Sequence, residues 1–147
     1  MEISRKRIMG LDFGSKTVGV AITDETRTCI RPLPVIRREK PGKLRKTLSA
    51  ITELLKEYDC DRIILGLPLN MDGSEGERVR LTREFRELLV KRVNIPVILF
   101  DERLTTVEAY EIMKERGIDK KEQLKIVDSV AAEIILNSYI DSGAYYE

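Results

Sequence analysis

The chain has 147 residues, of which 42% are hydrophobic, and this length and composition predict a single domain over residues 1–147. Its 26 basic and 25 acidic residues leave a formal net charge of +1, so any contact with nucleic acid must depend on a local basic patch. Histidine is absent, which excludes catalytic triads and zinc sites that use histidine. No apolar run approaches the roughly 18 residues of a membrane span.

Three strand-like segments open the chain. The apolar run 7–13 and the β-branched run 17–23 are separated by a short turn and are expected to pair as a hairpin. The third segment, 29–36, contains Pro32 and Pro34. Because proline cannot donate a hydrogen bond to a neighbouring strand, this segment is predicted to be an edge strand.

Helical and strand-like periods then alternate. The first helical face carries Leu44, Leu48, Ile51, Leu55 and Tyr58, and the second carries Val79, Phe85, Leu88 and Leu89. The short apolar run 62–67 lies between these helices and is typical of a central, fully buried strand. Residues 97–100 are expected to form the last strand.

Two helices close the chain. Thr105 is predicted to cap the first, with Glu108 completing a capping box, and Gly117 is predicted to end it. The last helix should span about residues 121–141, with Leu124, Val127, Ala131, Ile134 and Ile135 facing inward. The order β-β-β-α-β-α-β-α-α predicts an α/β fold: a mixed five-stranded sheet, its first three strands a meander, flanked by helices.

Three acidic residues occupy positions where these patterns favour apolar or neutral side chains. Asp12 lies at the end of the first strand, Glu102 follows the strand 97–100, and Asp128 lies beside the inward face of the last helix. Each has an ordinary structural explanation when taken alone. Asp12 fits a turn or capping residue, Glu102 a surface ion-pair partner and Asp128 a solvated helix residue.

The joint placement of the three carboxylates favours a metal site. Ligands of α/β sheets bind beyond the carboxyl ends of the strands, where both Asp12 and Glu102 are expected. If these two strands are neighbours, their carboxylates converge, and a divalent cation would remove the repulsion between like charges. A site made of carboxylate oxygens favours Mg²⁺ or Mn²⁺, and two such ions about 4 Å apart assist phosphodiester hydrolysis.

Four motifs give the chain a resemblance to a known family. In order, they are LDFGSKTVGVAITD, ILGLPLNMDGSEGE, FDERLTTVEA and VDSVAAEIILNSYI. They resemble the YqgF/RuvX family of RNase H-like proteins, and the resemblance extends over nearly the whole chain. It implies an RNase H-like fold related to the RuvC Holliday junction resolvases.

The resemblance also implies an activity. It implies a metal-dependent nuclease that processes the 5′ end of pre-16S rRNA in ribosome biogenesis, with resolution of four-way DNA junctions as the alternative. The catalytic and metal-binding triad of the family falls on Asp12, Glu102 and Asp128, with Mg²⁺ or Mn²⁺ as the cofactor. RuvC-type sites often have a fourth carboxylate, where this chain has Ser129 and Ala132. A second metal ion would therefore be held weakly, or together with substrate phosphate.

Candidate contacts to a nucleic-acid backbone surround the predicted site. The segment 37–46 contains six basic residues and one acidic residue, and the loop 66–77 offers backbone N–H groups beside the strand ends. The candidate residues are Lys16, Arg37, Arg38, Lys43, Arg45, Lys46, Asn70, Ser74 and Arg103. A solvated loop and helix start explain the same charges without a ligand. Because aromatic residues make up only 5% of the chain, we expect recognition of shape and backbone rather than of base sequence.

Other functions remain open from the residues alone. An ATPase of the actin or Hsp70 type needs two RNase H-like lobes, and 147 residues supply one. A non-catalytic RNA-binding factor for ribosome assembly is compatible with the sequence. Since no dimer surface is evident, we expect a monomer or weak homodimer, although a resolvase should be a dimer. Cys29 and Cys60 lack motif spacing and are typical of reduced thiols in a cytoplasmic protein without membrane contact.

Overall fold

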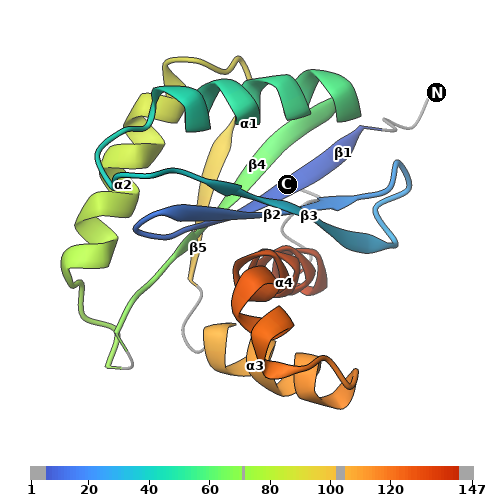
Figure 1. Cartoon of the computed structure of the whole chain (residues 1–147). Coiled ribbons are helices and arrows are strands. Elements are labelled where there is room, and N and C mark those ends of the chain that lie inside the picture. The colour runs from blue at the N-terminus through green and yellow to red at the C-terminus, as the bar shows by residue number, and fades with distance from the viewer. Residues whose placement is uncertain (1–5, 71, 102–104, 143–147) are drawn as a thin grey trace.

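The computed structural model describes residues 6–70, 72–101 and 105–142, and the side chains of all of these except 105–108. The described residues form five strands and four helices in the predicted order (Figure 1). The strands are β1 (Arg7–Phe13), β2 (Thr17–Thr23), β3 (Ile30–Arg37), β4 (Cys60–Leu67) and β5 (Val97–Asp101). The helices are α1 (Arg45–Tyr58), α2 (Glu77–Val90), α3 (Thr105–Glu115) and α4 (Lys120–Asp141).

The strands form one mixed sheet in the order β3-β2-β1-β4-β5. The first three strands pair antiparallel as the predicted meander, whereas β1, β4 and β5 run parallel to one another. The proline-containing β3 lies at the edge and the apolar β4 lies inside the sheet, as predicted. The carboxyl ends of β1 and β5 therefore share one edge of the sheet, but β4 separates the two strands.

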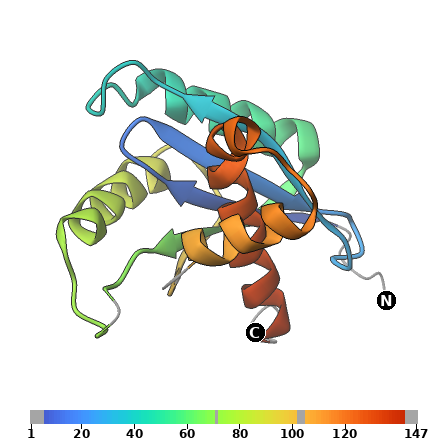
Figure 2. The ribbon, with the colours of Figure 1, turned by 60° about the horizontal axis from the view of Figure 1, so that its bottom comes forward.

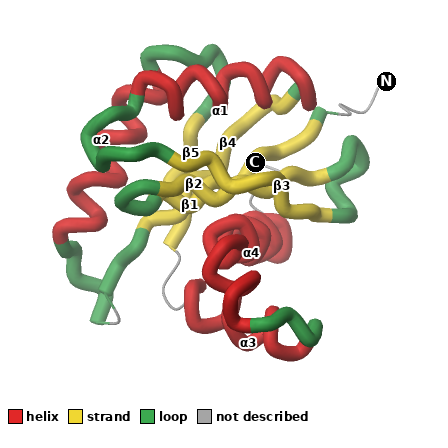
Figure 3. The backbone as a smooth tube through the Cα atoms, in the orientation of Figure 1, coloured by secondary structure: helices red, strands yellow, loops and turns green. Residues whose placement is uncertain are grey.

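Helices cover both faces of the sheet (Figure 3). On one face, α1 and α2 pack over a core that includes Met9, Leu11 and Phe13 of β1, and the ring of Phe13 stacks on that of Phe85 with centroids 4.1 Å apart. On the other face lies α4, and α3 packs against α4 (Figure 2). The two faces follow from the alternation of side chains along each strand.

Most predicted helix faces are confirmed, but the prediction that Leu88 and Leu124 face inward is wrong. Leu88 of α2 is 40% exposed and Leu124 of α4 is 70% exposed. Leu88 lies between the buried Phe85 and Leu89, at the border of the face of α2 that covers the core, whereas Leu124 precedes the buried part of α4. In α4 the buried residues begin at Val127, so the preceding turns extend past the sheet.

Two predicted turn and cap features can be compared with the structure. Gly117 follows α3 with φ +74°, a left-handed conformation that glycine adopts without strain, which confirms it as the helix stop. The helix begins at Thr105, but the proposed capping box of Thr105 and Glu108 lies outside the described side chains. Asp24, directly after β2, accepts hydrogen bonds from the backbone N–H groups of Thr28 and Cys29, and the Thr28 bond is the main cause that lowers its pKa to about 2.

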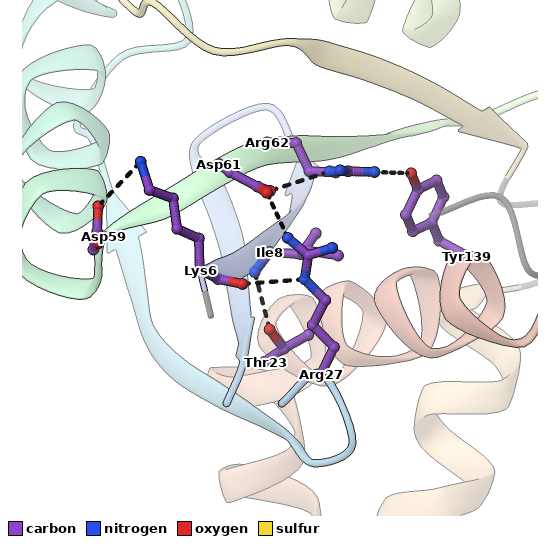
Figure 4. A network of polar contacts seen from close by, with 8 residues as sticks. All are labelled: Lys6, Ile8, Thr23, Arg27, Asp59, Asp61, Arg62 and Tyr139. Carbon is purple, nitrogen blue, oxygen red and sulfur yellow. Dashed lines mark hydrogen bonds and ion pairs between the residues drawn. The ribbon is translucent and has the colours of Figure 1, made fainter. Parts of the chain in front are cut away.

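A polar network ties the strands together at the end of β1 remote from Asp12 (Figure 4). Asp61 accepts hydrogen bonds from Arg27 and from Arg62, whose guanidinium also donates to the hydroxyl of Tyr139 on α4 at 3.1 Å. The hydroxyl of Thr23 accepts from the backbone N–H of Ile8 at 2.9 Å. These contacts join the β2–β3 turn, β4 and α4, and they have a structural role. Among the described residues, no helix is both long and apolar enough to cross a bilayer.

Candidate functional site

Asp12 is a buried carboxylate at the end of β1. It is 3% exposed and lies opposite Gly19 of β2 in the antiparallel register. Its neighbours Leu11 and Phe13 belong to the core beneath α1 and α2, and strand alternation therefore directs Asp12 to the face that α4 covers. A carboxylate is costly to bury unless charged or hydrogen-bonding groups compensate it, so this position indicates a specific use.

Glycines bring α4 against the strands beside Asp12. A Cβ atom on Gly19 would lie 1.8 Å from the backbone oxygen of Asp128, and a Cβ on Gly10 would lie 2.9 Å from that of Ala132. Neither position can therefore accept a larger side chain without moving α4. The absence of side chains at these two positions places Asp128 directly over β2, one strand away from Asp12.

Asp128 is also held by a side chain of β2. The hydroxyl of Thr17 donates a short hydrogen bond to Oδ2 of Asp128, across 111 positions of sequence. The carboxylate is partly buried, and one of its oxygens is oriented by this bond. Thr17 is therefore a candidate positioning residue for Asp128.

Asp12 and Asp128 line one cavity of about 660 Å³ at the edge of the sheet where β1 ends. The turn after β1, the β3–α1 connection and α2 form its other walls, and these three segments lie side by side in Figures 1 and 2. Two carboxylates from opposite ends of the sequence thus open into a single space. This is the sheet edge at which α/β proteins bind their ligands.

Two arginines border the same cavity. Nη2 of Arg78 lies 3.9 Å from Oδ1 of Asp12 and donates to the backbone oxygen of Phe13 at 3.3 Å. The guanidinium of Arg38 lies 4.8 Å from the centroid of the Phe13 ring and donates to the backbone oxygens of Gly14 and Ser15, each at 2.7 Å. Burial lowers the pKa of Arg38 from its usual value. Arg38 therefore holds the turn that connects β1 to β2.

The donor set in the cavity fits a hard divalent cation. Asp12 and Asp128 supply carboxylate oxygens and Thr17 lies next to them, with no nitrogen or sulfur ligand among the lining residues. Such oxygen donors suit Mg²⁺ or Mn²⁺. In the part of the chain that the structure describes, no group of three acidic, histidine or cysteine side chains is assembled. The predicted third ligand, Glu102, lies outside the described residues.

The carboxylates of Asp12 and Glu102 are expected to converge if their strands are neighbours, and this condition is not met. The strand before Glu102, β5, pairs with β4 and not with β1. Parallel pairing still places the carboxyl end of β5 at the same sheet edge as Asp12. The carboxylate that the structure does bring to Asp12 comes from α4.

The predicted basic contacts divide into exposed and structural residues. Five of them are exposed: Lys16, Arg37, Lys43, Arg45 and Lys46. Of these, Arg37 also donates to the backbone oxygen of Lys125 on α4 at 2.7 Å, whereas the half-buried Arg38 holds the β1–β2 turn. Arg103 lies outside the described residues. Lys43, Arg45 and Lys46 lie at the start of α1, next in sequence to Gly42 and Leu44 of the cavity wall.

Asn70 and Ser74 contact each other within the loop before α2. The side-chain amide of Asn70 donates to the hydroxyl of Ser74 at 3.0 Å, and their backbones are also hydrogen-bonded. Ser129 is likewise structural, because its hydroxyl donates to the backbone oxygen of Leu33 at 2.7 Å. Ala132 packs over Gly10. Ser129 and Ala132 therefore have structural roles, and neither replaces the fourth carboxylate.

Sequence reasoning missed three contributors to this site: Thr17, Gly19 and Arg78. The position of Thr17 beside Gly19 in a β-branched strand is a weak signal, because threonine is common in strands. Arg78 is one of several arginines in α2 and differs from the others only through its tertiary contact with Asp12.

Comparison with known proteins places the chain in a family. The family model described as "RuvX: Holliday junction resolvase" matches residues 6–142. A relative from Agathobacter rectalis is 50% identical over 135 residues, which cover 92% of this chain and 94% of the relative. A relative from Bacillus subtilis is 39% identical over 137 residues, with 92% and 98% covered. Both carry the name "Putative pre-16S rRNA nuclease".

Solved structures support the fold. The RuvC of T. thermophilus in complex with a Holliday junction substrate has a TM-score of 0.56 at 12% identity, over 94% of this chain and 96% of that chain. The fowlpox virus resolvase in complex with Holliday junction DNA has a TM-score of 0.54 at 17% identity, with 92% and 97% covered. The mixed sheet and its helices are thus those of the RNase H-like resolvases, and the chain belongs to the RuvX family of phosphodiester-hydrolysing nucleases.

Proposed function

We propose that this chain hydrolyses phosphodiester bonds with the help of Mg²⁺ or Mn²⁺, and that its substrate is the 5′ end of pre-16S rRNA. The observation that carries the proposal is the convergence of Asp12 and Asp128 in one cavity at the carboxyl end of β1. The names of the curated relatives favour the RNA substrate over a DNA junction. A cytoplasmic location agrees with such a substrate.

The cofactor would be held by Asp12 and Asp128, with Glu102 as the proposed third ligand. A divalent ion bound there supplies Lewis-acid stabilisation of the charge on the attacking and leaving oxygens. Thr17 keeps one oxygen of Asp128 in a fixed orientation. The burial of Asp12 limits the alternative conformations of its carboxylate, which favours a preorganised site.

Positive charge beside the carboxylates would bind the substrate backbone. Arg78 has a side chain that is 57% exposed, so its guanidinium can accept a phosphate while it remains near Asp12. The exposed Lys43, Arg45 and Lys46 extend this positive surface toward α1. Phosphates are the same in every nucleic-acid sequence. The basic residues of the segment 37–46 would therefore bind the backbone without recognising particular bases.

The test compares two substrates in the presence of Mn²⁺ or Mg²⁺: an RNA that spans the 5′ leader of pre-16S rRNA and a mobile four-way DNA junction. We expect cleavage of the RNA by the wild-type chain. Asp12→Asn, which removes a ligand charge with little change of shape, should reduce the rate by more than about a hundredfold. Asp141→Asn, the same substitution at the exposed end of α4, is the matched control and should cleave like the wild type.

Each other outcome contradicts a stated part of the proposal. Cleavage of the DNA junction alone would show that the substrate is a four-way DNA junction, which the RuvC-like fold suggests, and not the RNA. Equal cleavage by the wild type and Asp12→Asn would show that the site is misplaced. Tight RNA binding without cleavage by any variant would favour a non-catalytic factor for ribosome assembly.

A further inference from the structure

One face of α2 adds an apolar wall to the cavity that contains the carboxylates. Arg78, Leu81, Phe85 and Leu88 are spaced by three, four and three residues, so they lie along one stripe of the helix, and all four line the cavity. Phe85 is fully buried, but Leu81 and Leu88 are each 40% exposed. Exposed leucines on a stripe that faces a cavity need an explanation other than core packing.

The rest of the wall comes from the β3–α1 connection and the end of β1. It includes Pro41, Leu44 and the ring of Phe13 beneath the guanidinium of Arg38. The cavity is therefore bordered both by apolar side chains and by the guanidinium groups of Arg38 and Arg78. With a volume of about 660 Å³, this space lies within the range of roughly 300–1,000 Å³ that is usual for ligand pockets.

The stripe leads away from the carboxylates along α2. At the start of the stripe, Nη2 of Arg78 lies 3.9 Å from the Asp12 Oδ1. Leu88 follows ten residues later, which corresponds to about 15 Å along the helix axis. The cavity thus extends from the proposed cleavage site over a length that accommodates more than one nucleotide.

We propose that this apolar part of the cavity binds an unpaired base of the substrate next to the cleaved phosphodiester. The base would lie against Leu81 and Leu88, while the guanidinium groups of Arg38 and Arg78 stand near its phosphates. The proposal rests on the proposed nuclease function, and it adds a requirement for a single-stranded nucleotide at the cleavage site. A paired base is stacked on its faces and bonded along its pairing edge, so it cannot leave the duplex to fill this space without unpairing.

Two observations favour a nucleotide over another apolar ligand. The apolar wall is continuous with the two carboxylates, because the same cavity contains both. In addition, Glu84 lies on the wall between Leu81 and Leu88, held by an ion pair of 2.8 Å with Arg80. Its carboxylate can accept hydrogen bonds from the exocyclic amino groups of a base.

The test measures binding of two labelled single-stranded RNA oligonucleotides of equal length, one intact and one with abasic sugars at its central positions. Asp12→Asn serves as the background so that no strand is cleaved. We expect the intact oligonucleotide to bind more tightly than the abasic one. Leu81→Ala combined with Leu88→Ala should weaken binding of the intact strand by about fivefold or more and leave the abasic strand unchanged.

Val90→Ala is the matched control, because Val90 is 44% exposed on the same helix but does not line the cavity. It should bind both oligonucleotides like the parent. Equal binding of the intact and abasic strands, or no effect of the double leucine variant, would overturn the base-binding proposal. If the double leucine variant binds the intact strand like its parent while the wild-type chain still cleaves the leader RNA, the proposed function stands and only the base subsite is wrong.

Discussion

Single side chains decide the chemistry of this molecule, and Asp12 shows how. Its carboxylate is almost completely buried at the end of β1, yet it opens into the cavity that also contains Asp128. The cavity lining contains no histidine or cysteine, so a metal ion bound there would have carboxylate oxygens as its protein ligands. A charge that is expensive to bury is thus kept at the position where it can bind a cation.

Thr17 is the residue whose effect on the site can be measured most directly. Thr17→Val keeps the shape of the side chain but removes the hydroxyl that donates to Asp128. Because residues that orient metal ligands usually contribute 10- to 100-fold to affinity, we expect Mn²⁺ binding to weaken by about tenfold or more. Isothermal titration calorimetry with Mn²⁺ would measure this change.

Thr17→Ser provides the matched control, since it retains the hydroxyl and should restore most of the Mn²⁺ affinity. A merely structural role would lower the stability of Thr17→Val without a change in metal affinity. Equal affinities of the valine variant and the wild type would therefore remove Thr17 from the proposed site.

At the scale of elements, the contact between α4 and the β1–β2 hairpin builds the site. Gly10 and Gly19 offer bare backbone to α4, so the helix lies close enough to bring Asp128 to the cavity. Arg38 fixes the turn of the same hairpin through the backbone oxygens of Gly14 and Ser15. The hairpin is consequently held from both faces of the sheet.

Gly19→Ala tests this contact. The added Cβ would lie 1.8 Å from the backbone oxygen of Asp128, a distance that requires a movement of α4 or β2. We expect the free energy of unfolding to fall by about 3 kcal/mol or more, at the upper end of the usual cost of overpacking. Denaturant unfolding followed by circular dichroism would measure the loss.

Gly42→Ala is the control for this substitution, because no atom lies within 4 Å of the Cβ that it would add. Its stability should remain within about 0.5 kcal/mol of the wild type. A loss of less than about 1 kcal/mol in Gly19→Ala would show that α4 can move away from the hairpin at little cost.

At the scale of the whole molecule, the near-zero net charge makes the distribution of charge decisive. With 26 basic and 25 acidic residues, no overall positive field attracts nucleic acid. The exposed basic residues around the start of α1 lie next to the cavity, whereas other exposed lysines lie elsewhere on the molecule. We therefore expect local rather than global electrostatics to govern RNA binding.

The salt dependence of RNA binding tests this expectation. Arg45→Gln combined with Lys46→Gln removes two charges beside the cavity, and it should reduce the slope of log Kd against log salt concentration by about 1.5. Lys56→Gln combined with Lys91→Gln removes the same charge from the far end of α1 and from the residue after α2. An equal reduction of the slope by both double variants would contradict a local binding surface.

The order of elements and most of their bounds follow from local patterns in the sequence. Alternation, helical period, the prolines of β3 and Gly117 act over a few residues, which is why β1 and β2 are predicted to the residue. The exposure of Leu88 and Leu124 is not predictable in this way, because Leu88 lies at the border of the buried face of α2 and Leu124 precedes the part of α4 that packs on the sheet. A periodic pattern shows which face is apolar but not where the covering sheet ends.

The sequence by itself determined the α/β class, the acidic candidates and, through four motifs, the family. Only the tertiary structure decided that β4 separates β1 from β5. It also decided that Asp128 of α4 lines the same cavity as Asp12, and that the hydroxyl of Thr17 orients the carboxylate of Asp128. The contact between Thr17 and Asp128 spans 111 positions of sequence, and the strand order likewise depends on pairings between segments that are separated along the chain. Local propensity carries no information about such contacts, since packing of α4 on two glycines selects them.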